Sequence, residues 1–193
     1  MEGVSGQDAG KITASLTHAA QGMSTLDVNT AGLRSAVSGF PAVASVSADA
    51  SFPHGLTIQV AQREPVMVAS DGKHQVAVAA DGSLLPGVHA SKKLPRFRVD
   101  SLPESGRFEG QGLSEARVLG ATPAPLSPLI AGAAVTHDYG VVVTLRGGIA
   151  IRLGNAERPA AQWAAAAAVL ADPKLTSLAY VDVRVPERPA VGG

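Results

Sequence analysis

The spacing of apolar residues in the first 40 positions predicts two helices. Apolar side chains recur at helical spacing in residues 9–21, and Gly22 follows where a glycine is typical of a helix end. A second helix is predicted from an N-cap at Asp27 to Gly39. It cannot extend further, because the residue before Pro41 is disfavoured in helical geometry.

After residue 42 the apolar period changes from helical to two, which predicts a hairpin. Residues 43–50 and 56–60 alternate as strands do, and the intervening segment holds Pro53 and Gly55. Two such strands form a small sheet, and the apolar stripe of the preceding helices can cover one of its faces. The first module is therefore predicted to be helix, helix, hairpin.

The middle of the chain has short strands separated by turn dipeptides. Asp71-Gly72 and Asp81-Gly82 are typical of reverse turns. The predicted strands are 66–70, 73–79 and 83–85. From residue 86 to about 134 the pattern is weaker, and it predicts a strand at 96–99 and a helix at 112–121 or 126–132.

The last third predicts a meander, a helix and a final strand. The meander strands are 135–139, 141–146 and 149–153. A helix follows from Pro159 and ends before Asp172-Pro173. In the final strand, residues 178–185, alternate valines face one way, and the residues between them face the other. The expectation is that one face is buried and the other is offered to solvent.

These elements together predict an α+β fold. Residues 1–65 form the helix, helix, hairpin module, and residues 66–185 form a mixed or antiparallel β-sheet domain with flanking helices. Residues 186–193 are expected to be a C-terminal tail.

Composition narrows the functional classes. The chain has 193 residues, of which 46% are hydrophobic, so it can bury one or two modest cores. Its 16 basic and 16 acidic side chains cancel, so no global field attracts nucleic acid or anionic lipid. The absence of cysteine excludes disulfides and cysteine-ligated zinc.

No catalytic or metal-binding motif is found in the sequence. The histidines do not fall at ligand spacing, and the signatures of serine hydrolases, P-loops and dinucleotide sites are missing. Asp71 and Asp81 are better explained as turn residues than as paired carboxylates, and His54 is better explained as a turn residue than as a catalyst. Trp163 is interpreted as a core residue. We expect no cofactor and no metal.

Membrane insertion is not predicted for any segment of the chain. The longest nearly apolar run, 163–171, is shorter than the roughly 20 residues that a spanning helix needs. The N-terminal residues do not have the sections of a secretory signal. We expect the chain to be a fragment of a longer protein.

The order of motifs resembles one family. Residues 22–69 resemble the POTRA region of FtsQ/DivIB bacterial cell-division proteins, with the strand motif at Pro41, Val43, Ser45 and Val46, the Phe52-Pro53 turn, the strand Leu56, Ile58 and Val60, and the exit at Arg63, Pro65 and Val66. The resemblance continues in ADGSLLPG at 80–87, VVVTLRGGIAIRLGN at 141–155 and YVDVRVPERPAVGG at 180–193. It is weakest between about 88 and 130.

The resemblance implies a non-catalytic scaffold of the division machinery. Such a protein is a single-pass membrane protein, and this chain would lie on its extracytoplasmic side at the septum. The implied partners are small coiled-coil proteins of the FtsB/FtsL type, with septal synthases of the FtsW/FtsI type as further candidates. Val185 stands where some members carry an aromatic residue, so contacts that need a ring are in doubt there.

The family places partner binding at its terminal strand, and edge strands can accept a partner strand through their unpaired backbone groups. The expected partner-binding residues are Tyr180, Val181, Asp182, Val183, Arg184 and Val185. The side chains of Tyr180, Asp182 and Arg184 would then contact the partner and give the binding its selectivity. In the alternative reading, this strand is internal and its charges are simply solvated.

Two other functional classes remain open. A POTRA-bearing component of polypeptide transport or secretion would use the same first module. An extracytoplasmic enzyme is the third possibility, and neither alternative explains the closing YVDVRVPERP.

Overall fold

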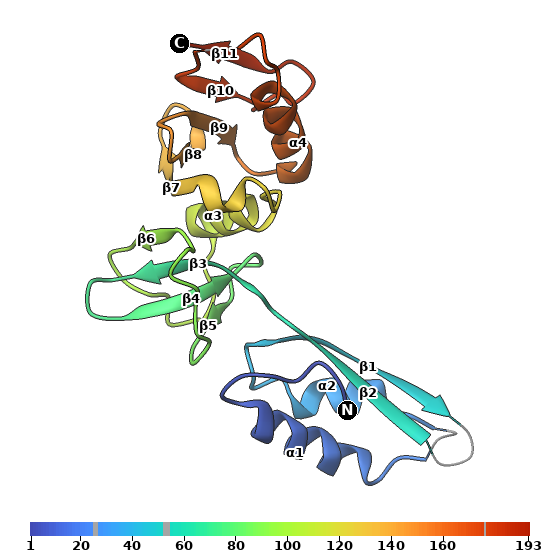
Figure 1. The fold of residues 1–193 in the computed structure, drawn as a ribbon. Helices are drawn as coiled ribbons and strands as arrows, with labels where there is room; N and C mark the ends of the chain where they lie inside the picture. The colour runs from blue at the N-terminus through green and yellow to red at the C-terminus, as the bar shows by residue number, and fades with distance from the viewer. Residues whose placement is uncertain (25–26, 52–54, 176) are drawn as a thin grey trace. The chain divides into compact units, whose positions relative to one another are not determined.

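A computed structural model describes residues 1–24, 27–51, 55–175 and 177–193 (Figure 1). The predicted turn residues Phe52, Pro53 and His54 lie outside these ranges. The chain forms two compact units, one of residues 1–64 with 85–89 and the other of residues 65–84 with 90–193. The predicted α+β fold class is confirmed, with helices and a hairpin first and a sheet domain after them.

The first unit contains two helices and one hairpin. Helices α1 (Ala9–Ala20) and α2 (Thr30–Ala36) precede strands β1 (Val43–Ser51) and β2 (Gly55–Gln62). The strands pair antiparallel, with Val46 opposite Val60. The buried residues of both helices and both strands form one core: Ile12, Leu16, Leu33, Val37, Val43, Val46, Ile58 and Val60.

The second helix is shorter than predicted, and its cap is a different residue. The Asn29 side chain accepts a hydrogen bond from the Gly32 N–H at 2.9 Å, so Asn29 is the N-cap. The prediction of a cap at Asp27 is wrong. An Asn at this position satisfies one of the N–H groups that a helix start leaves unpaired.

The second unit begins with a four-stranded sheet. Its strands are β3 (Pro65–Ser70), β4 (Gln75–Ala79), β5 (Leu84–Leu85) and β6 (Arg96–Arg98), in the order β5-β4-β3-β6. The β3–β4 pair is antiparallel and the β3–β6 pair is parallel. The Asp71 carboxylate accepts the N–H groups of Lys73 and His74 at 2.8 and 2.6 Å, and Asp81 accepts the N–H of Ser83 at 3.0 Å. Both aspartates are therefore turn residues, as predicted.

One predicted helix in the middle of the chain is wrong. Helix α3 (Gly110–Gly120) is followed by a 3-10 turn at Ser127–Leu129, and strand β7 (Ile130–Thr136) starts directly after it. The predicted helix at 126–132 therefore covers a turn and the start of a strand. Ile130 is buried and pairs with Leu145 of the neighbouring strand, so sheet pairing outweighs the local helical pattern here.

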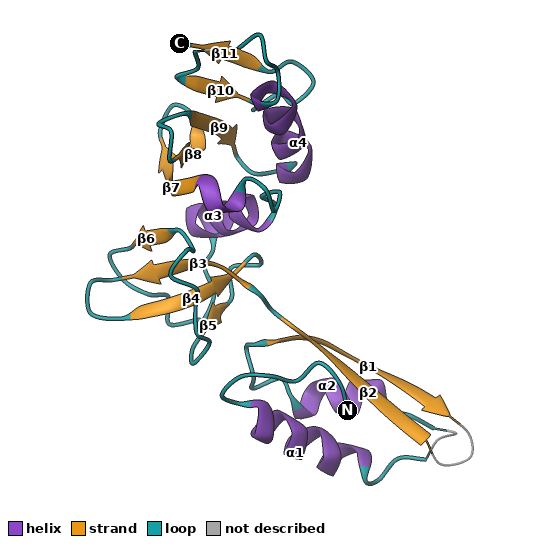
Figure 2. Ribbon diagram, viewed as in Figure 1, coloured by secondary structure: helices purple, strands orange, loops and turns teal. Residues whose placement is uncertain are grey.

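A five-stranded mixed sheet completes the second unit. Strands β8 (Gly140–Leu145) and β9 (Ala150–Gly154) are followed by helix α4 (Pro159–Leu170) and strand β10 (Tyr180–Asp182). The chain ends in strand β11 (Ala190–Gly192), so the expected tail is in part a strand. The order is β11-β10-β9-β8-β7, with β9 and β10 parallel (Figure 2). Helix α4 is the crossover connection that a parallel pair requires.

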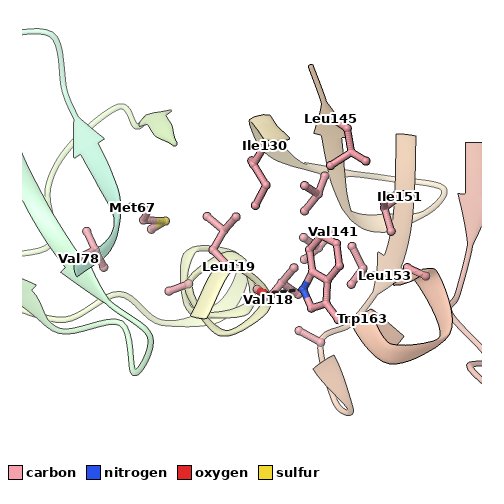
Figure 3. Packing of buried hydrophobic residues seen from close by; sticks show 14 of the residues in the cluster. Met67, Val78, Val118, Leu119, Ile130, Val141, Leu145, Ile151, Leu153 and Trp163 are labelled. Atoms are coloured by element: carbon pink, nitrogen blue, oxygen red, sulfur yellow. Dashed lines mark hydrogen bonds between the residues drawn. The ribbon is translucent and has the colours of Figure 1, made fainter. Parts of the chain in front are cut away.

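The core of the second unit is built around Trp163 of α4. Its side chain is fully buried, and the indole N–H donates to the backbone carbonyl of Val118 in α3 at 2.8 Å (Figure 3). Ile151 and Leu153 of β9 face the same core. Trp163 is thus a core residue, as predicted, and it joins the two helices to the sheet.

Candidate functional site

The C-terminal border of the five-stranded sheet holds all six predicted partner-binding residues, but their strand is not at the edge. Strand β10 lies between β9 and β11 (Figure 2). Val181 of β10 pairs with Ile151 of β9 on one side and with Val191 of β11 on the other. The predicted edge strand at 178–185 is therefore wrong in two ways: the strand spans only Tyr180–Asp182, and the chain's own β11 covers its outer side.

The chain reverses between β10 and β11, which is why β10 is covered. Val183 still donates to the Arg152 carbonyl at 3.0 Å, and the Arg188 N–H then donates to the Val185 carbonyl at 2.9 Å. Glu187 in this turn accepts two hydrogen bonds from the Arg158 guanidinium, at 2.6 and 3.1 Å. A two-point pair of this kind fixes the turn to the residue that precedes α4.

Strand β11 forms the outer border of the sheet. In the part of the chain that the structure describes, the order of this sheet ends at β11. Ala190 and Val191 are exposed, Val191 to 40%, and Val185 in the preceding turn is exposed to 54%. A border strand with exposed small and apolar residues can accept a further strand through its backbone.

The Arg152 side chain of β9 lies between the rings of Tyr139 and Tyr180. The Arg152 guanidinium carbon is 3.8 Å from the Tyr139 ring centroid and 3.7 Å from that of Tyr180. Arg152 is on the sheet face opposite the buried Ile151 and Leu153. Cation–π contacts on both faces of one guanidinium hold Tyr180 in a fixed orientation.

The Tyr180 ring in turn lies over β11. A Cβ atom at Gly192, which pairs with Tyr180, would be only 2.5 Å from the ring's Cε1 atom. Position 192 therefore has room for hydrogen alone. The ring covers the backbone of β11 on this face.

Asp182 and Arg184 form an internal ion pair. Arg184 Nη2 is 2.8 Å from Asp182 Oδ2, and Arg184 Nη1 also donates to the Asp138 carbonyl at 3.3 Å. Burial by itself would raise the pKa of Asp182, but the hydrogen bonds and positive charge of Arg184 lower it overall. The same pairing raises the pKa of Arg184. Arg184 already has a carboxylate partner within the chain.

A shallow hollow of about 380 Å³ adjoins this pair. It is lined by Asp138, Tyr139, Gly140, Gly154, Asn155 and Arg184. The hollow lies at the start of β8 and the end of β9, on the side of the sheet where Arg152 meets the tyrosines. Its lining residues include one arginine, one asparagine and one aspartate.

Sequence reasoning missed Tyr139, Arg152 and β11. The alternation in residues 150–154 places Arg152 opposite Ile151 and Leu153, so that signal was present for one of them. No pattern in the sequence brings Tyr139 to Tyr180, since 40 residues and a helix separate them. Of the six predicted residues, Tyr180 and Asp182 are half-buried, Val181 and Val183 are buried, and Arg184 and Val185 are exposed.

Among the described residues, no group of three histidine, aspartate or glutamate side chains could hold a metal ion. No helix in the described ranges is both long and apolar enough to cross a membrane.

Comparison with known proteins assigns the family. A family profile described as "Cell division protein FtsQ/DivIB, C-terminal" matches residues 66–184. The cell division protein FtsQ of Streptomyces venezuelae is 30% identical over 159 residues, which is 79% of this chain. The chain spans 58% of that relative's length. The predicted resemblance is confirmed: this chain belongs to the FtsQ/DivIB family of cell division proteins.

Proposed function

We propose that this chain is the non-catalytic, extracytoplasmic part of a single-pass membrane protein at the division septum. It recruits coiled-coil partners of the FtsB/FtsL type and helps assemble the septal peptidoglycan synthesis machinery, including synthases of the FtsW/FtsI type. The family assignment supports a role in cell division. In this proposal, residues 1–65 act as a POTRA-like domain and residues 66–185 as the partner-binding domain.

The observation that carries the proposal is the open border at β11. Among the described residues, the inner strands of the five-stranded sheet have neighbours on both sides, whereas the border strands β11 and β7 each pair with one strand, β10 and β8 respectively. The outward N–H and C=O groups of such a strand can pair with an extended partner segment. We infer that the partner strand adds to β11, one strand further out than the sequence suggested.

In this proposal, residues 180–185 mainly hold β11 in position, and most of them do not contact the partner directly. Val181 pairs with Val191, and Tyr180 covers Gly192, so β10 determines where β11 lies. The Asp182–Arg184 pair holds the start of the turn. Val185 is exposed and can contribute apolar contact to an added segment.

A proline in β11 tests strand addition. Val191→Pro removes a backbone N–H and restricts the strand, whereas Val191→Thr keeps the backbone and the β-branched shape. We expect the FtsB-type partner, in a titration by calorimetry, to lose affinity for Val191→Pro by at least tenfold and to bind Val191→Thr with little change. Thermal unfolding of both variants checks that the fold is kept. Equal affinity for the two variants would show that the backbone of β11 is not used.

A further inference from the structure

A second charged surface lies in the four-stranded sheet, away from the β11 border. Residues 82–99 contain no aspartate or glutamate, although the whole chain is neutral. The same stretch carries four cations, Lys92, Lys93, Arg96 and Arg98, and all four are exposed. Positive charge is therefore in excess in the segment that contains β6.

The sheet register places both arginines on one face. Arg96 is opposite Val68 and Arg98 is opposite Ser70, and Gln75 of β4 is opposite Ser70 on the other side. Residues that are directly opposite in neighbouring strands point to the same face. Arg96, Arg98, Ser70 and Gln75 therefore share one face of this sheet.

This face contains a groove of about 380 Å³. It is lined by Val68, Ser70, Gly72, Gln75, Arg96, Phe97 and Arg98. Arg96 crosses the sheet to donate to Gln75 Oε1 at 3.1 Å, and Arg98 lies beside Gly72. Asp100, two residues after Arg98, and Asp71, next to Gly72, are not among the lining residues. The Asp71 carboxylate accepts the N–H groups of Lys73 and His74. The groove thus presents two guanidinium groups and no carboxylate.

We propose that this groove, hereafter the β6 groove, binds an extended acidic segment of a partner polypeptide that carries carboxylates at alternate positions. Arg96 and Arg98 are two residues apart on a strand, so their Cα atoms are separated by about 6.6 Å. An extended peptide repeats its side chains with the same period on one face. Each guanidinium can then pair with one carboxylate through two hydrogen bonds.

The groove favours a peptide over an anionic membrane. Polybasic membrane-binding segments act as clusters of point charges on a surface that lipids can approach. Here the two central cations are arginines, whose planar fork selects carboxylate or phosphate geometry, and they line a concave site with Ser70 and Gln75 beside them. This surface is separate from β11, so it would serve a partner other than the strand that adds there.

Charged side chains on an edge strand also prevent unwanted sheet pairing, and that role alone would explain the arginines. The two explanations differ in what binds the intact protein. A protective role predicts no acidic ligand and predicts self-association when the arginines are replaced. A docking role predicts a ligand whose affinity depends on carboxylate spacing.

The test uses the 193-residue chain and a labelled seven-residue peptide with glutamate at positions 2, 4 and 6, separated by threonine and valine. A peptide of the same composition with three consecutive glutamates is the spacing control. We expect fluorescence anisotropy to show at least threefold tighter binding of the alternating peptide, with affinity falling as salt is raised. Equal affinity for the two peptides would overturn the proposal.

Variants locate the binding to the groove. Arg96→Gln with Arg98→Gln should weaken binding of the alternating peptide at least tenfold. Arg34→Gln with Arg117→Gln changes the net charge equally at exposed arginines of α2 and α3, and it should leave the affinity within twofold. Equal loss in both pairs would mean that only net charge matters and would contradict the proposal. Binding to vesicles of anionic lipid with no binding of the alternating peptide would also contradict it.

Discussion

At the scale of single residues, the C-terminal border depends on contacts that leave almost no spare volume. Tyr180 is held by Arg152 on one side and lies over Gly192 on the other. The sequence shows that Tyr180 and Arg152 have polar-face positions, because their neighbours alternate with buried residues. It does not show that their side chains stack, since that depends on the parallel register of β9 and β10.

Gly192→Ala should disturb this border. The added Cβ would lie 2.5 Å from the Tyr180 ring, so the ring or the strand must move. Overpacking of this kind costs about 1–3 kcal/mol. We expect the free energy of unfolding, measured by urea denaturation, to fall by that amount and partner affinity to fall with it. Gly147→Ala is the control, because nothing lies within 4 Å of its added Cβ. Equal stability of the two variants would contradict the close contact.

Glu115 should make the stability of the second unit depend on pH. It is buried in α3, and among the described residues no hydrogen-bond partner satisfies its carboxyl oxygens. Burial raises the pKa of Glu115 from 4.5 to about 8, and the nearby backbone of Val135 offsets only part of this effect. Between these two values the folded chain holds a proton that the unfolded chain has lost. The free energy of unfolding therefore falls as pH rises through this interval, by about 1.4 kcal/mol per pH unit.

Glu115→Gln removes the titrating group while keeping its size. Urea denaturation between pH 5 and 8 should give a clearly shallower pH dependence for the variant than for the parent chain. Above about pH 8 the contribution of Glu115 should level off, because both states are then ionised. Parallel pH profiles for the parent chain and the variant would show that Glu115 titrates normally in the fold.

At the scale of elements, the periodicity of apolar residues predicted most of the helices and strands. It failed where pairing with a distant strand determines the secondary structure. Helices α1 and α4 and the β1–β2 hairpin follow directly from the spacing of apolar residues. Residues 130–132 read as helix but form part of β7, because Ile130 pairs across to Leu145. Strand β11 has only three residues and includes a glycine, so no alternation marks it.

The helix cap of α2 gives a prediction at this scale. Asn29→Ala removes the side chain that accepts the Gly32 N–H, and such a loss costs about 1 kcal/mol. Asp27→Ala changes the residue that the sequence favoured as the cap and should cost much less. Thermal unfolding followed by circular dichroism in the helical region compares the two variants. A larger loss for Asp27→Ala would place the cap where the sequence suggested.

At the scale of the whole molecule, the second of the two compact units carries two surfaces with different chemistry. The second unit has a backbone border at β11 and, on another sheet, the arginine-lined β6 groove. Motif order in the sequence was sufficient to predict the family, and family membership is confirmed. The position of the open border required the sheet order, because the chain after residue 185 turns back and covers the strand that the motif identifies.

Amide hydrogen exchange, measured with and without the FtsB-type partner, tests strand addition at β11 most directly. Backbone pairing with an added strand should slow exchange of the amides in residues 190–192. Exchange in β7, at the opposite border of the same sheet, should stay unchanged. Unchanged exchange in 190–192, together with slower exchange at another surface of the chain, would contradict recruitment through β11.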